Sequence, residues 1–286
     1  MPWLMVVLVF GVVIFGATVG ISFQLTRRSY LSGVTRSPAE LGLSFENITF
    51  QTQDGLILHG WWIPAAGSDR AVVVMHGHTG SMDGDLHRVP AWHEAGLNVC
   101  MFDFRAHGRS PGRLSTYGYL ERLDAQAAAR FAAREKGMRR VALIGFSLGG
   151  MTAMLAAPDC PEVNVVVEDG APARLFSGLK GWCVEHHLPR WSAPIVAWLA
   201  IAGASLRLRT NLFQYEPVRW VGRIAPRPLM IIHGDQDRYC PDFADLLKAA
   251  PAAEVWRLPE IGHTEASQVY PEEYRERVLD FLRRNL

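Results

Sequence analysis

A regular alternation of strand-like and helix-like segments after residue 45 limits the possible folds more than any other feature. Continuous apolar runs, of the kind buried in parallel sheets, lie at 71–75, 98–104, 140–146, 163–167, 228–233 and 254–258. Segments with helical spacing lie between or after them, at 86–95, 117–135, 148–157, 241–250 and 270–284. Two β-prone runs, 48–52 and 56–63, flank Asp54-Gly55 and predict a hairpin. The pattern predicts an α/β fold with a mostly parallel eight-stranded sheet and helices on both faces.

The alternation is interrupted between residues 171 and 224. This segment is too long for a loop inside a compact domain. Its many tryptophan, leucine and other apolar residues, among them Trp182, Trp191 and Trp198, indicate helices instead. We therefore expect residues 171–224 to form a helical cap inserted over the sheet.

The N-terminus differs from the rest of the chain because no charged residue occurs between positions 3 and 23. As a helix this run would reach about 30 Å, the thickness of a bilayer core. We predict a transmembrane anchor at 1–25, a tether at 26–44 and a catalytic domain at 45–286. A cleaved signal peptide is the alternative, but its basic residues should come first, whereas Arg27 and Arg28 follow the run. These arginines predict that the catalytic domain faces the cytoplasm.

Charge and cysteine content exclude several classes of protein. The formal net charge of +1 gives no field for attracting nucleic acid. The four cysteines are scattered without a CxxC pair, so we interpret them as free thiols that form neither a disulfide framework nor a zinc site.

Ser147 is the candidate nucleophile. It lies in Gly145-Phe146-Ser147-Leu148-Gly149-Gly150, between a predicted strand and a predicted helix. That context suits a nucleophile elbow, a turn so tight that the residues two before and two after the serine must lack bulk. The turn would lift the hydroxyl clear of the sheet and leave it at the positive end of a helix dipole.

A serine hydroxyl needs a base, and the base needs a carboxylate that orients it. After an elbow of this kind the acid comes next in the chain and the histidine last. His263 is the predicted base because it lies in a glycine-bearing loop between the last strand and the last helix. His233 ends a strand and is expected to have a supporting role, while His186 and His187 fall in the cap.

Two aspartates follow the strand that ends near residue 233. Asp237 is preferred as the acid because the turn at Gly234 should bring its side chain inward. Asp235 is closer to the strand end, where aspartates commonly cap turns, and Asp169 is a third candidate.

An acyl-transfer site also needs donors for the oxyanion. The backbone NH of Leu148, directly after the nucleophile, is one candidate, and that of His78 in His76-Gly77-His78 is the other. The spacing of His76 and His78 is also compatible with a metal site. A third ligand at suitable spacing is not evident in the sequence, so we expect neither a metal nor a cofactor.

Further motifs accompany these residues: Asp54-Gly55-Leu56 with Leu58, Gly60 and Trp61, then His76-Gly77, and Phe102 to Ser110. Together with the serine elbow, Asp237 and His263 they resemble the α/β-hydrolase superfamily over residues 45–286. The similarity is greatest to membrane-anchored bacterial α/β-hydrolases and to Bem46-like α/β-hydrolase-domain proteins. The resemblance implies that Asp103, Arg105 and His107 support the oxyanion loop and carry no chemistry.

The predicted activity is that of an esterase acting through an acyl-Ser147 intermediate on small-molecule or lipid-like esters. The apolar cap motivates this choice, since its tryptophan and leucine side chains could line an acyl pocket. A serine peptidase or amidase, with Glu185 as an acidic anchor, and a thioesterase would use the same residues. A membrane-tethered binding module without catalysis is the alternative from another class.

Overall fold

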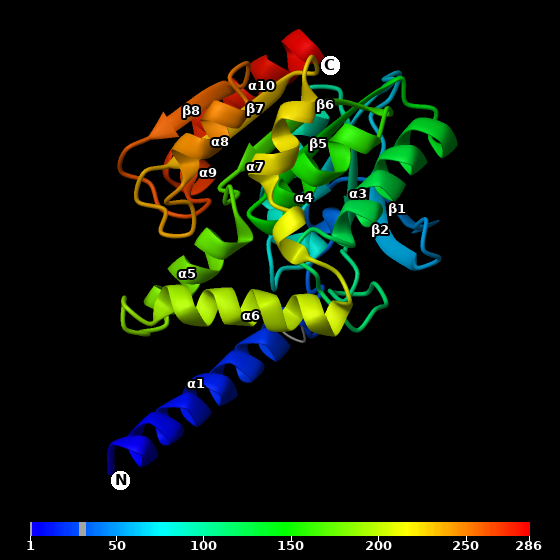
Figure 1. Ribbon diagram of the computed structural model, residues 1–286. Helices are drawn as coiled ribbons and strands as arrows, with labels where there is room; N and C mark the ends of the chain where they lie inside the picture. Colours follow the sequence, from blue (N-terminus) through cyan, green and yellow to red (C-terminus); the bar gives the residue numbers. More distant parts are fainter. Residues whose placement is uncertain (1, 29–32) are drawn as a thin grey trace.

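A computed structural model describes residues 2–28 and 33–286 (Figure 1). Met1 of the predicted anchor and residues 29–32 of the predicted tether lie outside the described residues. The core is one sheet in the order β1-β2-β4-β3-β5-β6-β7-β8. The strand bounds are β1 Glu46–Gln51, β2 Ile57–Ile63, β3 Arg70–Met75, β4 Asn98–Phe102, β5 Arg140–Phe146, β6 Val163–Asp169, β7 Leu229–Gly234 and β8 Glu254–Leu258.

The sheet confirms the predicted fold class. β1 and β2 form the antiparallel hairpin around Asp54-Gly55, and β2 also pairs antiparallel with β4. The other neighbours, from β4 through β3 to β8, are parallel. All carboxyl ends of the parallel strands therefore meet at one edge, where α/β proteins place their sites.

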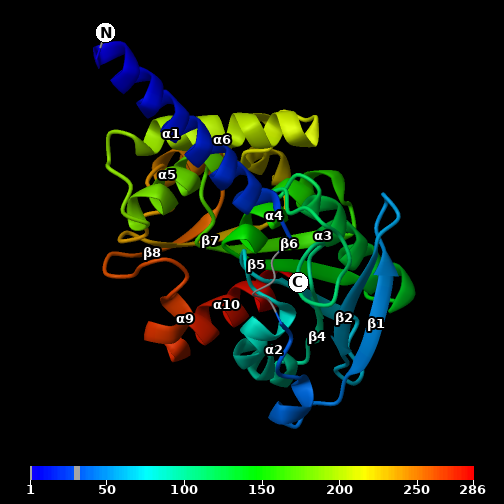
Figure 2. The same cartoon turned by 90° about the horizontal axis from the view of Figure 1, so that it is seen from below.

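Helices cover both faces of the sheet (Figure 2). One apolar cluster joins the sheet to α3 (Glu121–Arg130), α4 (Leu148–Ala156) and α8 (Phe243–Ala249). A second cluster joins the other face to α2 (Val89–Glu94), α9 (Ala266–Val269) and α10 (Pro271–Asn285).

Two of the predicted helices differ most from the observed bounds. The helix expected at 86–95 begins as a 3-10 turn, Met82–Arg88, before α2. The helix expected at 117–135 starts at Glu121 and ends in a π turn, Phe131–Glu135. Tyr117 and Gly118 both have positive φ, which no helix can accommodate.

The segment predicted as a cap contains α5 (Leu175–Glu185), α6 (Ala193–Leu208) and the short α7 (Pro217–Trp220). Figure 1 shows α5 and α6 below the body of the protein, with α6 lying across it. The inner faces of both helices join the cluster that contains α4, through residues such as Leu179, Val196 and Ile201. These helices are thus packed onto the edge of the sheet where the parallel strands end.

The N-terminal helix α1 (Pro2–Thr26) is long and apolar enough to cross a membrane. Its first half projects away from the body and its second half runs against α6 (Figures 1 and 2).

Arg27, Arg28 and Thr35, which the structure describes after α1, are attached to the body. Arg27 forms a β-bridge with Leu114, and Arg28 donates hydrogen bonds to three backbone carbonyls, those of residues 108, 110 and 112. The backbone NH of Thr35 donates to Asp83.

Candidate active site

The serine elbow joins β5 to α4. Ser147 has φ 52° and ψ −110°, a backbone conformation that L-residues rarely adopt. Its backbone NH donates to the carbonyl of Asp169 at 2.9 Å, which ties the turn to the end of β6. The serine side chain thereby stands at the carboxyl edge of the sheet, just before the first residue of α4.

Two glycines make the turn possible. A Cβ on Gly149 would lie 2.1 Å from the carbonyl oxygen of Met75. A Cβ on Gly145 would lie 2.2 Å from the carbonyl of Gly149. Both distances are far below van der Waals contact, and both involve backbone atoms that cannot rotate away. The sequence analysis expected residues without bulk at these two positions, and the structure gives the reason: a side chain at either one would overlap the backbone.

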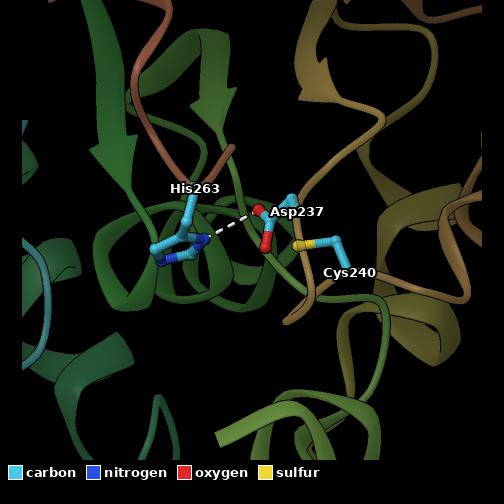
Figure 3. Close-up of side chains that lie close together, drawn as sticks. All are labelled: Asp237, Cys240 and His263. Atoms are coloured by element: carbon cyan, nitrogen blue, oxygen red, sulfur yellow. Dashed lines mark hydrogen bonds and ion pairs between the residues drawn. The ribbon is translucent and has the colours of Figure 1, made fainter. Parts of the chain in front are cut away.

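Ser147 lies in a chain of hydrogen bonds with the two other predicted residues. His263 Nε2 is 2.8 Å from Ser147 Oγ, and His263 Nδ1 is 2.7 Å from Asp237 Oδ2. The second bond is drawn in Figure 3. The loops after β7 and β8 supply Asp237 and His263, and the sheet brings them to a serine 116 positions before the histidine.

Asp237 is held firmly in this arrangement. Its side chain is fully buried, and its Oδ1 accepts a hydrogen bond from the backbone NH of Tyr239 at 2.8 Å. The other oxygen is free to accept the Nδ1 proton of His263, which leaves Nε2 as the acceptor for the serine hydroxyl.

The other candidates lie elsewhere. Asp235 forms an ion pair with Arg257 at 2.5 Å. Asp169 is buried behind the elbow, where burial raises the pKa of its carboxyl to about 6. His233 stacks on Phe243 with ring centroids 3.6 Å apart, and its burial lowers its pKa. His186 and His187 follow α5 at the exposed surface of the cap.

The two predicted oxyanion donors border the same space. Leu148 is the first residue of α4, so its NH has no acceptor within the helix. His78 lines the pocket together with Ser147, and a Cβ on Gly77 would lie 3.7 Å from that of Ser147. The loop therefore passes close to the nucleophile.

His76 fixes that loop. Its Nε2 accepts a hydrogen bond from the backbone NH of Phe104, so Nδ1 carries the proton and donates to the carbonyl of Gly77 at 2.8 Å. Burial lowers the pKa of both His76 and His78 to about 3. Both rings are therefore neutral at physiological pH, and the loop adds no positive charge.

The residues after β4 brace the loop from behind. Asp103 accepts hydrogen bonds from the backbone NH groups of Met82 and Arg109. Arg105 forms ion pairs with Asp54 and Asp124, which join the β1–β2 hairpin to α3. His107 packs edge-on against the ring of His76, at a centroid distance of 5.2 Å.

Comparison with known proteins gives the family. Residues 56–278 match the Alpha/beta hydrolase family. The chain belongs to this family.

Relatives and solved structures agree with that assignment. The chain is 29% identical to YfhR, an uncharacterized protein of Salmonella typhi, over 86% of this chain and 82% of that protein. It is 25% identical to the alpha/beta hydrolase domain-containing protein WAV2 of Arabidopsis thaliana, over 85% of this chain and 80% of WAV2. Among solved structures, the Pyrococcus furiosus esterase PF2001 is similar, with a TM-score of 0.72 and 28% sequence identity. The match covers 88% of this chain and 95% of the esterase. These matches confirm the resemblance to the α/β-hydrolase superfamily that the sequence motifs indicated.

An apolar cavity of about 90 Å³ lies beside Ser147 and His263. Its walls come from the sheet edge, from the cap and from the N-terminal helix, through residues that include Met151, Leu175, Leu179, Trp182 and Leu25. The cap therefore encloses the candidate site together with α1.

Tyr239, Tyr117 and Leu25 are among the lining residues that the sequence analysis did not find. Tyr239 packs against the ring of His263 at 4.5 Å, and its position two residues after Asp237 could have suggested this. Tyr117 packs on His78 at 4.7 Å. Leu25 at the end of α1 carries no sequence signal for a site, because it belongs to a helix that is apolar on every side.

Three side chains of types that bind metals lie close together at the site. Ligand atoms of Asp237, Cys240 and His263 lie within 4.8 Å of one another (Figure 3). Burial and the neighbouring carboxylates raise the pKa of the Cys240 thiol, whereas a metal needs the thiolate. Both ring nitrogens of His263 are already in hydrogen bonds. This donor set is better suited to proton transfer than to metal binding.

Gly149→Ala tests the close approach at the elbow. We expect a loss of about 3 kcal/mol or more in the free energy of unfolding, because the new methyl group must displace the backbone of Met75. Gly84→Ala is the matched control, since nothing lies within 4 Å of a Cβ there. Urea denaturation measures both, and equal stability of the two variants would contradict the packing argument.

Proposed function

We propose that this alpha/beta hydrolase is a serine esterase that cleaves carboxylic esters through an acyl-Ser147 intermediate. The observation that carries the proposal is the pair of hydrogen bonds from Ser147 Oγ to His263 and from His263 to Asp237, 2.8 and 2.7 Å long. A serine hydroxyl becomes a useful nucleophile when a neutral imidazole can take its proton and a carboxylate stabilises the imidazolium.

The residues then have these roles. His263 removes the hydroxyl proton as Ser147 Oγ attacks the ester carbonyl, and the backbone NH groups of His78 and Leu148 stabilise the oxyanion. The imidazolium gives its proton to the leaving alcohol, and the acyl group stays on the serine. Water then attacks the acyl-serine with His263 as the base, releasing the carboxylic acid and restoring the hydroxyl.

The pocket supports an ester of an apolar acid as substrate. None of the described residues that line it carries a carboxylate, so they offer no acidic anchor for a substrate amine. Glu185, the anchor considered for a peptidase, lies at the exposed end of α5, where its carboxylate accepts a hydrogen bond from Tyr239 and does not itself line the pocket. The similarity to the Pyrococcus furiosus esterase PF2001 points in the same direction.

We further propose that α1 is a retained membrane anchor, residues 1–25, with the catalytic domain on the cytoplasmic side. Contacts made upstream of residue 20 favour retention over cleavage as a signal sequence. Phe10 stacks on Trp191 with ring centroids 6.0 Å apart, and Gly11, Ile14 and Phe15 line a groove that α1 shares with α6. Cleavage within α1 would remove apolar surface that the cap covers. Arg27 and Arg28 follow the helix directly, as the positive-inside rule requires for a cytoplasmic domain.

Ser147→Ala tests the nucleophile. Hydrolysis of p-nitrophenyl butyrate should fall by about 10⁶-fold, because the group that forms the acyl-enzyme is gone. The thermal melt should match that of the parent, since alanine fits the elbow as well as serine does. Full activity in Ser147→Ala, or no hydrolysis by the parent chain, would contradict the proposal.

Asp237→Asn and Asp235→Asn form a matched pair on the same turn. We expect Asp237→Asn to lower kcat by about 10⁴-fold through loss of the orienting carboxylate. Asp235→Asn should leave kcat nearly unchanged, because that carboxylate pairs with Arg257 away from the site. If Asp235→Asn lowered kcat and Asp237→Asn did not, the proposal of Asp237 as the acid would be wrong.

The anchor is tested on the full chain in membranes. Carbonate should leave the protein in the membrane pellet, and sequencing of the mature protein should find the N-terminus near residue 1. Extraction by carbonate would exclude an integral helix. A mature N-terminus near residue 20 would identify a signal sequence instead.

A further inference from the structure

The outer face of the cap helix α6 is apolar and exposed. Four large side chains on or just before the helix have exposed fractions of 61% for Trp191, 46% for Ile195, 54% for Trp198 and 82% for Leu206. Their spacing of three, four and eight residues places them along one side of the helix. The opposite side, with Val196, Ala200 and Ile201, is packed in the core. A surface helix of a water-soluble domain normally has a polar outer face.

This apolar face lies beside α1. Trp191 stacks on Phe10 with ring centroids 6.0 Å apart, and a Cβ on Gly203 would lie 3.3 Å from Ser22 Oγ. At the other end Arg207 lies over the ring of Phe23. The two helices therefore run together from about Phe10 to the end of α1, while the first residues of α1 continue beyond α6 (Figures 1 and 2).

The charges on α6 and in the turns that flank it are basic, and the nearest acidic residues along the chain are the exposed Glu185 and the buried Glu216. Residues 186–215 contain Arg190, Arg207 and Arg209 and no aspartate or glutamate. The arginines lie at the two ends of the helix and are exposed. A helix with an apolar outer face and basic ends fits the boundary between acyl chains and anionic lipid headgroups.

We propose that α6 is a second membrane-contacting element, which lies in the interface of the leaflet that α1 enters and inserts its outer face among the lipids. A bilayer is favoured over a protein partner as the occupant of this face. Nearly all of α1 is exposed and apolar, so it needs lipid around it, and the outer face of α6 continues the same surface.

The position of α6 also bears on the substrate, on the premise that the proposed esterase activity is correct. An open groove of about 780 Å³ runs between α1 and α6, and Ser22 forms part of its wall. Leu25, one helical turn further, lines the pocket of Ser147. We infer that the substrate is a membrane-resident ester whose acyl chain enters from the leaflet along this groove.

Fluorescence tests the membrane contact without relying on activity. The four native cysteines are buried, so an introduced thiol at Ile195→Cys can be labelled selectively with an environment-sensitive fluorophore. Val255→Cys is the matched control, because Val255 is 39% exposed and is the second residue of β8, at the end of the sheet opposite the cap. Both labelled full-length chains are placed in vesicles of phosphatidylcholine and phosphatidylglycerol.

Lipids with a nitroxide on the acyl chain should quench the label at position 195 and leave the label at 255 bright. Aqueous iodide should do the reverse. Equal quenching at the two positions would overturn the proposal. A label at 195 that neither quencher reaches would also overturn it, since protein rather than lipid would then cover α6.

Activity in the same vesicles tests the substrate. Ile195→Glu should slow hydrolysis of a long-chain p-nitrophenyl ester dissolved in the bilayer by about tenfold, because a charge on this face opposes insertion. Hydrolysis of water-soluble p-nitrophenyl acetate should stay at the parent rate, and Val255→Glu should change neither. Equal slowing on both esters, or no slowing on the long-chain ester, would contradict delivery from the bilayer. Failure of the parent to hydrolyse either ester would count against the esterase proposal alone, because the quenching result does not depend on it.

Discussion

The whole arrangement depends on the near-contact of backbones where β5 turns into α4. Gly149 passes so close to the end of β3 that a single Cβ would lie 2.1 Å from the carbonyl of Met75. This crossing forces Ser147 into a positive-φ conformation and lifts its hydroxyl over the sheet edge. The strands fix every partner relative to that point, since β7 and β8 end at the same edge and their loops carry Asp237 and His263. Strain at one residue is thus maintained by the packing of the whole sheet.

Few charged groups lie around Ser147, and the carboxylate of Asp237 is fully hydrogen-bonded. His76 and His78 are neutral because burial lowers their pKa to about 3, and Asp237 is buried with both oxygens in hydrogen bonds. A base with an uncharged ring and a single orienting carboxylate is what removal of a hydroxyl proton needs. The apolar cap and Leu25 limit access of water to these groups.

The sequence predicted the fold well because its signals are local. Each buried strand is a continuous apolar run, and Asp54-Gly55 determines its own hairpin. The glycines of the elbow and the motifs around Asp237 and His263 likewise depend on short stretches of chain. Contacts between distant segments have no such signal. The packing of α1 on α6, the place of Leu25 in the pocket and the attachment of Arg28 to the loop after β4 come from tertiary structure alone.

The central claim, that Ser147 is an activated nucleophile, has one direct test. A fluorophosphonate reacts covalently with a serine that has a working base and oxyanion donors. After the full-length protein is treated with such a probe and digested, mass spectrometry should find the phosphonyl group on the peptide that contains Ser147. Heat-denatured protein should carry none. Absence of the adduct from the folded protein, or its presence on another serine, would contradict the account.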